Sequence, residues 1–235
     1  YERTYYNSIL SSQNPETGMT TYFQPMATGY FKVYSSEFDH FWCCTGSGME
    51  SFTKLGDTTY MHRNDTLFVN LYQSSVLNWK EKNVTITQKS TIPDGDKVTF
   101  TVNGSGSLDL RFRIPDWIAG NMIITVNGER FAYTDVNGYA QVKRNFSDGD
   151  IIELTLPQEV QVHTLPDAKG KVYAFTYGPV VLSAELGTTD MKKGSTGMWV
   201  SIPSEKIAGS ENITVNKENG SVSMFMSEIG KHLVK

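Results

Sequence analysis

The sequence predicts a mostly β protein, in which β-sandwich structure follows a shorter helical segment. The spacing of apolar residues is helical over roughly the first sixty positions and changes to a period of two from about Asp65. Turn signals then recur at the intervals that short antiparallel strands require. With 235 residues and 39% hydrophobic residues, the chain is long enough and apolar enough to bury a substantial core.

The N-terminal segment is predicted to be helical with intervening loops. The first residues, from Tyr1, have helical spacing, and there is no initiator methionine. We therefore expect that the chain begins inside a helix and is a piece of a longer protein. A second helix is predicted over about 48–60, with Ser47 as its N-cap. The residues expected on one face of it are Met49, Phe52, Leu55 and Thr59.

The strands are predicted from strict alternation of apolar and polar residues. Asn127-Gly128 and Asn137-Gly138 are hairpin turn signals, because this pair tolerates the positive φ angles of tight turns. The residues expected to face the core are Leu67, Val69, Leu71, Leu108, Leu110, Phe112, Ile114, Ile152, Leu154 and Leu156. Short strands with turns at this spacing favour a β-sandwich.

Three regions are therefore expected. Residues 1–64 are helical, residues 65–165 form the β-sandwich, and residues 166–235 contribute additional strands and a partly irregular tail of an incomplete second β module. Two strands of the third region are predicted at Val172–Thr176 and Val180–Ala184, on either side of Gly178-Pro179.

Charge and hydropathy exclude two classes of partner. The net charge is −4 and no basic stripe is present, which argues against nucleic acid. No apolar run approaches the ~20 residues of a membrane helix, so no membrane span is expected.

The two cysteines, Cys43 and Cys44, are adjacent. Neighbouring cysteines rarely form a disulfide, because the bond strains the intervening peptide. Three interpretations remain open, namely inert buried thiols, a metal site or a reactive thiol. Thiolates are soft ligands that suit zinc, but a zinc site needs four ligands, or three and an open position. A helix start after the pair would favour the thiolate.

Several segments that include this cysteine pair resemble glycoside hydrolase families 127 and 146, the zinc-dependent β-L-arabinofuranosidases. The resemblance covers about residues 1–187. The matching segments are Tyr1-Glu2-Arg3-Thr4-Tyr5-Tyr6-Asn7, Pro15-Glu16-Thr17-Gly18-Met19, Thr21-Tyr22-Phe23-Gln24-Pro25, Phe41-Trp42-Cys43-Cys44-Thr45-Gly46-Ser47-Gly48-Met49-Glu50, Asp65-Thr66-Leu67-Phe68-Val69-Asn70-Leu71-Tyr72, Arg113-Ile114-Pro115-Asp116-Trp117 and Tyr177-Gly178-Pro179-Val180-Val181-Leu182.

The resemblance implies that residues 1–64 are the last helices of an (α/α)6 catalytic barrel. It implies a retaining exo-glycosidase that acts on β-L-arabinofuranosides or related plant glycans and binds zinc through one Glu and three Cys. Cys43 would be the nucleophile and a zinc ligand, Cys44 a second zinc ligand, and Tyr22 a sugar contact. A thiolate nucleophile held deprotonated by zinc is consistent with retention.

The other two zinc ligands and the acid/base of this family lie upstream of the matching part. The chain itself is therefore expected to be inactive, to bind zinc weakly or not at all, and to self-associate through apolar barrel surface. The expected partner of the intact protein is an oligo- or polysaccharide, and a periplasmic or extracellular location is favoured. The alternative is a non-catalytic β-sandwich with a structural or carbohydrate-binding role. The roles of Trp42 and His40 stay open between packing and a part in the site.

Overall fold

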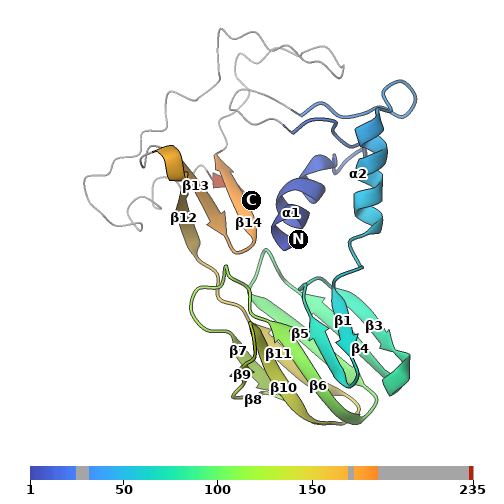
Figure 1. The fold of residues 1–235 in the computed structure, drawn as a ribbon, viewed down its shortest axis with the longest axis vertical. Coiled ribbons are helices and arrows are strands. Elements are labelled where there is room, and N and C mark those ends of the chain that lie inside the picture. Colours follow the sequence, from blue (N-terminus) through green and yellow to red (C-terminus); the bar gives the residue numbers. More distant parts are fainter. Residues whose placement is uncertain (25–31, 169–171, 185–232, 235) are drawn as a thin grey trace, which may run out of the picture. The chain divides into compact units, whose positions relative to one another are not determined.

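The computed structural model describes residues 1–24, 32–168, 172–184 and 233–234 (Figure 1). The chain forms two compact units. Unit 1 comprises residues 1–53, 162–175 and 180–235, and unit 2 comprises residues 54–161 and 176–179. Of the additional β module expected over 166–235, residues 169–171, 185–232 and 235 lie outside the described part of the chain.

Unit 2 contains two β-sheets. The first has the order β1-β2-β6-β10-β9 and includes one parallel pair, β2 with β6, while the second has the order β3-β4-β5-β11-β7-β8 and is antiparallel throughout its described pairs. The strands of the first are β1 (Tyr60–Arg63), β2 (Thr66–Val69), β6 (Gly106–Arg113), β10 (Tyr139–Phe146) and β9 (Thr134–Asp135). Those of the second are β3 (Ser75–Trp79), β4 (Val84–Ser90), β5 (Lys97–Asn103), β11 (Asp150–Thr155), β7 (Ile123–Val126) and β8 (Glu129–Arg130), with a 3-10 turn η3 (Lys80–Lys82) after β3.

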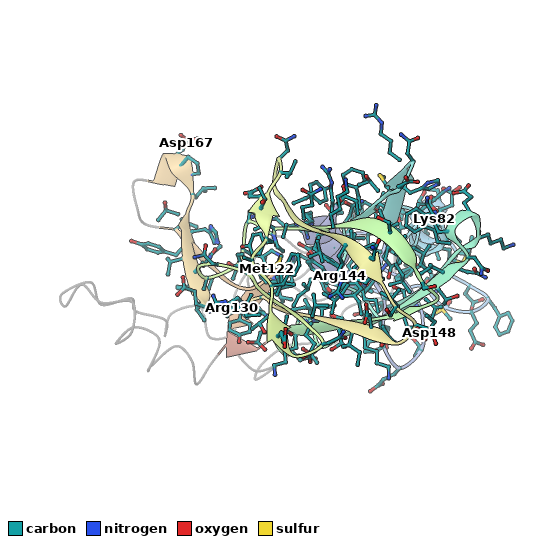
Figure 2. All side chains as sticks on the ribbon, turned by 90° about the horizontal axis from the view of Figure 1, so that it is seen from below. Lys82, Met122, Arg130, Arg144, Asp148 and Asp167 are labelled. Atoms are coloured by element: carbon teal, nitrogen blue, oxygen red, sulfur yellow. The ribbon has the colours of Figure 1, made fainter. Side chains whose placement is uncertain are left out.

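The core of unit 2 lies between these two sheets, and side chains fill the space between the ribbons (Figure 2). Phe100 of β5 meets Phe112 of β6 with ring centroids 4.9 Å apart, and both side chains are fully buried. Nine of the ten residues predicted to face the core are buried, namely Leu67, Val69, Leu71, Leu108, Leu110, Phe112, Ile152, Leu154 and Leu156. Ile114 is half-buried, because it follows the end of β6. The sandwich prediction is confirmed.

Both predicted hairpin turns are present. Asn127 and Asn137 have φ angles of 53° and 55°, and the glycine after each also has a positive φ. The first turn is fixed by Asp150, whose carboxylate accepts a hydrogen bond from the Asn127 side-chain amide at 2.8 Å. Asn127 in turn accepts from the Ile151 N–H at 2.8 Å, so the turn is fastened to β11.

Unit 1 begins with one helical run of changing pitch. It consists of α1 (Glu2–Thr4), a π-helical segment η1 (Tyr5–Ile9) and a 3-10 turn η2 (Leu10–Ser12). The second helix is α2 (Cys43–Thr53). Asn7 connects this run to a distant part of unit 1, because its side-chain oxygen accepts a hydrogen bond from the Val181 N–H at 2.7 Å.

A third sheet has the order β12-β13-β14-β15, with β12 (Val160–Thr164), β13 (Tyr173–Tyr177), β14 (Val180–Ala184) and β15 (Leu233–Val234). A 3-10 turn, η4 (Pro166–Ala168), follows β12. The two strands predicted on either side of Gly178-Pro179 are confirmed, the first of them shifted by one residue. In the described residues, no helix is both long and apolar enough to cross a membrane.

The prediction for the second helix was wrong in its bounds. The helix begins five residues earlier, at Cys43, and Ser47 is an internal residue whose hydroxyl returns to the Cys43 carbonyl at 3.5 Å. It ends at Thr53, and of the remaining residues expected to be helical, 54–59 form turns and Tyr60 begins strand β1. The predicted face was also wrong, since Met49 is 52% exposed, Thr59 is buried but lies beyond the end of the helix, and the one buried residue of α2 is Thr45.

Candidate functional site

The two cysteines occupy the first two positions of helix α2. Cys43 is exposed and Cys44 is half-buried, and neither forms a disulfide. The first N–H groups of a helix have no intrahelical acceptor and carry the positive end of the helix dipole. This position stabilises a thiolate relative to a thiol, so Cys43 combines accessibility with an environment that favours its nucleophilic form.

Tyr22 lies beside Cys43. The Cys43 sulfur and the Tyr22 hydroxyl oxygen are 3.7 Å apart, within hydrogen-bonding distance for sulfur. This contact with Tyr22 is the main cause that lowers the pKa of Cys43, and the thiol of Cys44 adds to it. The same contact with Cys43 raises the pKa of Tyr22 to about 12. The two shifts describe one arrangement, in which a protonated phenol donates to a thiolate.

The approach of Tyr22 to Cys43 depends on close packing between α2 and the chain segment before Tyr22. A β-carbon on Gly48 would lie 3.4 Å from the Thr20 hydroxyl oxygen, so a glycine at this point of the helix lets the segment pack closely. Thr20 is held from its other side by Ser35, whose N–H donates to the Thr20 carbonyl at 2.9 Å. Thr21 forms a β-bridge with Tyr34, and this bridge fixes the backbone directly before Tyr22.

Two further rings continue from Tyr22. Trp42 meets Tyr22 edge-to-face at 6.1 Å, with an interplanar angle of 88°, and His40 lies tilted against Trp42 at 5.7 Å. All three side chains are half-buried, so Trp42 belongs to this ring cluster rather than to an apolar core. His40 is held by Ser36, whose hydroxyl oxygen is 3.0 Å from His40 Nδ1.

The predicted site residues Tyr22, Cys43 and Cys44 are therefore brought together. Thr20 and Ser36, which support them together with Gly48, could not be identified from the sequence. A glycine inside a helix is a recognisable signal for close packing. Nothing in the sequence paired it with Thr20. Pro25, the last residue of the Tyr22 segment, lies outside the described part of the chain.

The donor atoms present fit zinc in kind but not in number. Two adjacent thiols at a helix start are suitable soft ligands. The described residues, however, contain no group of three or more His, Cys, Asp or Glu side chains that could hold a metal ion. The two cysteines thus offer at most half of a zinc site, and the described residues do not complete it.

Comparison with known proteins agrees with this geometry. Residues 1–57 match the sequence model of the beta-L-arabinofuranosidase GH127 catalytic domain, and residues 66–158 match that of the GH127 middle domain. The chain belongs to glycoside hydrolase family 127. Cys43, Cys44 and Tyr22 all lie in the part that matches the catalytic domain, whereas the sandwich matches the middle domain.

Solved structures of glycoside hydrolases share the fold of this chain. A GH127 beta-L-arabinofuranosidase from Geobacillus stearothermophilus T6 matches with a TM-score of 0.67 and 25% identity over 78% of this chain. A chain described as a glycoside hydrolase matches with a TM-score of 0.66 and 26% identity over 78%. A GH127 beta-arabinofuranosidase matches with a TM-score of 0.68 at 24% identity over 78% of this chain, which supports the fold alone.

The chain spans about a third of the length of these structures, covering 32%, 33% and 32% of them. No curated protein matches this chain.

Proposed function

We propose that this chain supplies the nucleophile of a retaining glycoside hydrolase that cleaves β-L-arabinofuranosides or related plant glycans. The observation that carries the proposal is Cys43, an exposed thiol at the start of α2 with a tyrosine hydroxyl 3.7 Å from its sulfur. Membership of family 127 supports a carbohydrate as the substrate.

The residues of this chain account for one half of a double displacement. The Cys43 thiolate attacks the anomeric carbon, a carbon–sulfur bond forms as the glycosidic carbon–oxygen bond breaks, and water later displaces the sulfur with net retention. A carboxylic acid from another part of the enzyme protonates the departing oxygen. Tyr22 keeps the sulfur ionised before attack by donating its hydroxyl proton in a hydrogen bond, and it lies close enough to contact the sugar.

We further propose Cys43 and Cys44 as two of the ligands of a zinc ion in the intact enzyme. Zinc, when bound, would keep the sulfur deprotonated and make it a better leaving group. Because the described residues offer no third ligand beside the cysteines, the remaining ligands must come from elsewhere. We expect the chain by itself to be inactive and to hold zinc weakly, since no preformed site would organise the ligands.

The test uses the longer enzyme that contains this chain, assayed on an aryl β-L-arabinofuranoside. Cys43→Ser should abolish turnover, and a slow substrate should leave a glycosyl group on the peptide that carries Cys43, detectable by mass spectrometry. Ser8→Ala is the matched control, because Ser8 is exposed on the N-terminal helical run. Undiminished turnover by Cys43→Ser would disprove the nucleophile assignment.

Zinc content is the second test. Metal analysis should find stoichiometric zinc in the longer enzyme and substoichiometric zinc in this chain. A stoichiometric ion with four protein ligands from this chain alone would contradict the proposal.

The alternative of a carbohydrate-binding sandwich receives little support. A sugar-binding face of a sandwich presents exposed aromatic rings. In unit 2, all of whose residues are described, no Phe, Tyr or Trp side chain is exposed. We propose that the sandwich over 65–165 is a structural module and that 1–64 belongs to the catalytic barrel. Calorimetric titration of the isolated sandwich, residues 54–165, with arabinan should give no heat of binding.

Apolar side chains of unit 1 support the proposed self-association. Phe38 is 88% exposed, Phe41 62% and Phe23 52%. Removal of such large apolar surface from water is favourable, so we expect concentration-dependent assembly of the isolated chain. Sedimentation velocity should show a rising weight-average mass with concentration, and a constant monomer mass would disprove it.

A further inference from the structure

The ring cluster beside Cys43 has a chemical feature that packing does not require. Each of its members, Tyr22, Trp42 and His40, is an aromatic ring with a polar atom, and each is half-buried. Such rings present apolar faces to the C–H groups of a ligand and polar edges to its oxygens. The Tyr22 hydroxyl is already engaged by Cys43, which leaves the polar edges of the other two rings to be considered.

The hydrogen bonds around Ser36 determine which nitrogen of His40 carries the proton. The Ser36 hydroxyl oxygen accepts from the Asp39 N–H at 3.2 Å and from the His40 N–H at 3.1 Å, so its two lone pairs are used. Its one O–H can then donate only to His40 Nδ1, 3.0 Å away. Nδ1 is therefore an acceptor, and the neutral imidazole carries its proton on Nε2.

This tautomer leaves two N–H donors, one on His40 and one on Trp42, without an acceptor among the described residues. Neither His40 Nε2 nor the Trp42 indole nitrogen has a hydrogen-bond partner among the residues that the structure describes. Both belong to rings in direct contact with each other, 5.7 Å between centroids, and Trp42 in turn contacts Tyr22. Sugar hydroxyl and ring oxygens are suitable acceptors for such donors, and the ring faces suit the C–H groups of the sugar.

We propose that His40 and Trp42 form a glycoside-binding surface, in which His40 Nε2–H and the Trp42 indole N–H donate hydrogen bonds to oxygens of the glycoside held at Cys43. Ser36 is the positioning residue that fixes the His40 tautomer. The ligand class is a hydroxyl-bearing furanoside, which rests on the proposed function. The assignment extends the site beyond Tyr22 and the cysteines to residues on the loop that leads into α2.

The first experiment measures the tautomer. Long-range ¹H–¹⁵N NMR of the whole chain at alkaline pH, where imidazole is neutral, should show His40 protonated on Nε2. Ser36→Ala removes the O–H donor and should give a mixture of both tautomers. His62, which is exposed and lies in unit 2, is the reference imidazole and should not change between the two proteins. A His40 proton on Nδ1 in the unaltered chain overturns the proposal.

The second experiment measures the ligand contact. Titration with methyl β-L-arabinofuranoside should shift the Trp42 indole N–H and the His40 Nε2 signals in the unaltered chain. His40→Phe and Trp42→Phe keep a ring and remove the donor, and each should weaken binding about three- to tenfold, as expected for one neutral hydrogen bond. The matched control is His62→Phe, which should bind as the unaltered chain does.

Equal affinity of His40→Phe, Trp42→Phe and the unaltered chain overturns the proposal, as does a titration in which neither ring signal moves. Ser36→Ala provides a third variant if one ring replacement disturbs folding, and it should bind about two- to threefold more weakly because only the correct tautomer donates. Neither experiment depends on turnover. Failure of the nucleophile assignment would therefore appear in the Cys43→Ser assay, and failure of this proposal in the NMR signals.

Discussion

Unit 2 and unit 1 are stabilised in opposite ways. Apart from Pro179, every buried apolar side chain of the described residues lies between Leu67 and Leu156, and all of them, Pro179 included, belong to unit 2. In the described part of unit 1, the buried residues are polar, namely Glu2, Thr20, Thr21, Ser35 and Thr45. Most of the large exposed apolar side chains of the first fifty residues are aromatic, and they surround no core of their own.

The difference separates a unit with an apolar core from the unit that carries the proposed nucleophile. A sandwich with a continuous apolar core contains its own driving force for folding. A unit whose buried groups are hydroxyls and a carboxylate depends on hydrogen bonds of modest net value. The thiol that we propose as the nucleophile thus lies in the unit that has no apolar core among its described residues.

The largest expected effect tests the core of unit 2. Phe112→Ala removes a fully buried ring that packs on Phe100, and it should lower the free energy of unfolding by about 3–5 kcal/mol. Urea unfolding followed by fluorescence of the buried Trp79 and Trp117 measures it. Phe38→Ala in unit 1 removes a ring that is 88% exposed and should change this value by less than about 0.5 kcal/mol. Equal losses from both variants would contradict the comparison.

The second-largest effect on stability is expected at Gly104, a glycine of unit 2 with a positive φ angle. Gly104 has a φ of 109°, and a β-carbon there would lie 2.7 Å from the Asn83 carbonyl oxygen. Gly104→Ala should therefore cost about 1–3 kcal/mol of unfolding free energy. Gly56→Ala is the matched control, because a β-carbon at Gly56 meets nothing within 4 Å, and it should be neutral or slightly stabilising. Calorimetric melting of both variants distinguishes the two outcomes.

Asp150 should make the stability of unit 2 depend on pH. The Asn127 amide first, then the Ser147 N–H and Arg144, hold the pKa of this carboxyl below its ordinary value of 3.8. A depressed pKa in the folded state adds stability that is complete above the ordinary value and is lost as the pH falls through the folded value. Asp150→Asn should cost about 1 kcal/mol at pH 7, and the difference from the unaltered chain should shrink in acid.

Urea unfolding at a series of pH values from neutral into acid measures this difference. An Asp150→Asn chain whose stability stays the same distance below that of the unaltered chain at every pH would refute the prediction.

The smallest effect on stability, and the largest on reactivity, is expected in unit 1. Tyr22→Phe removes the hydroxyl that lowers the pKa of Cys43, so alkylation of Cys43 at neutral pH should slow, and its rate should rise to a plateau only at higher pH. The unfolding of unit 2 should not change. The measurement uses iodoacetamide on metal-free protein and peptide mass spectrometry, with Phe41→Leu as a control that keeps Tyr22. An unchanged rate profile would show that the hydroxyl does not act on the sulfur.

The fold of unit 2 could be predicted from the sequence because burial imposes a period of two on each strand. The alternation at Leu108, Leu110 and Phe112 and the Asn-Gly pairs were sufficient to place strands and turns. The helix at Cys43 was not placed correctly, because its packing face carries no apolar stripe. Thr45 and Gly48 mark that face instead, and neither residue signals helix burial in a sequence pattern.

The sequence predicted the chemical groups of the candidate site but not the residues that hold them in position. Cys43, Cys44 and Tyr22 were named from their residue types and from the family resemblance, and the structure brings them together. The roles of Ser36 and Thr20 depend on contacts with residues outside any repeating pattern, as in the 3.0 Å contact between Ser36 and His40. Contacts of this kind follow from loop conformation, which local propensity does not determine.

The hydrogen bond between Asn7 and Val181 joins residues 174 positions apart within unit 1. During synthesis, the ribosome must therefore complete all of residues 54–161 before the partner of Asn7 exists. The sandwich, whose paired strands all lie within residues 60–155, can fold on the emerging chain first. Until then, the aromatic side chains of the N-terminal helices remain exposed to solvent. A chaperone that recognises exposed apolar segments should therefore bind nascent chains most strongly before Val181 emerges.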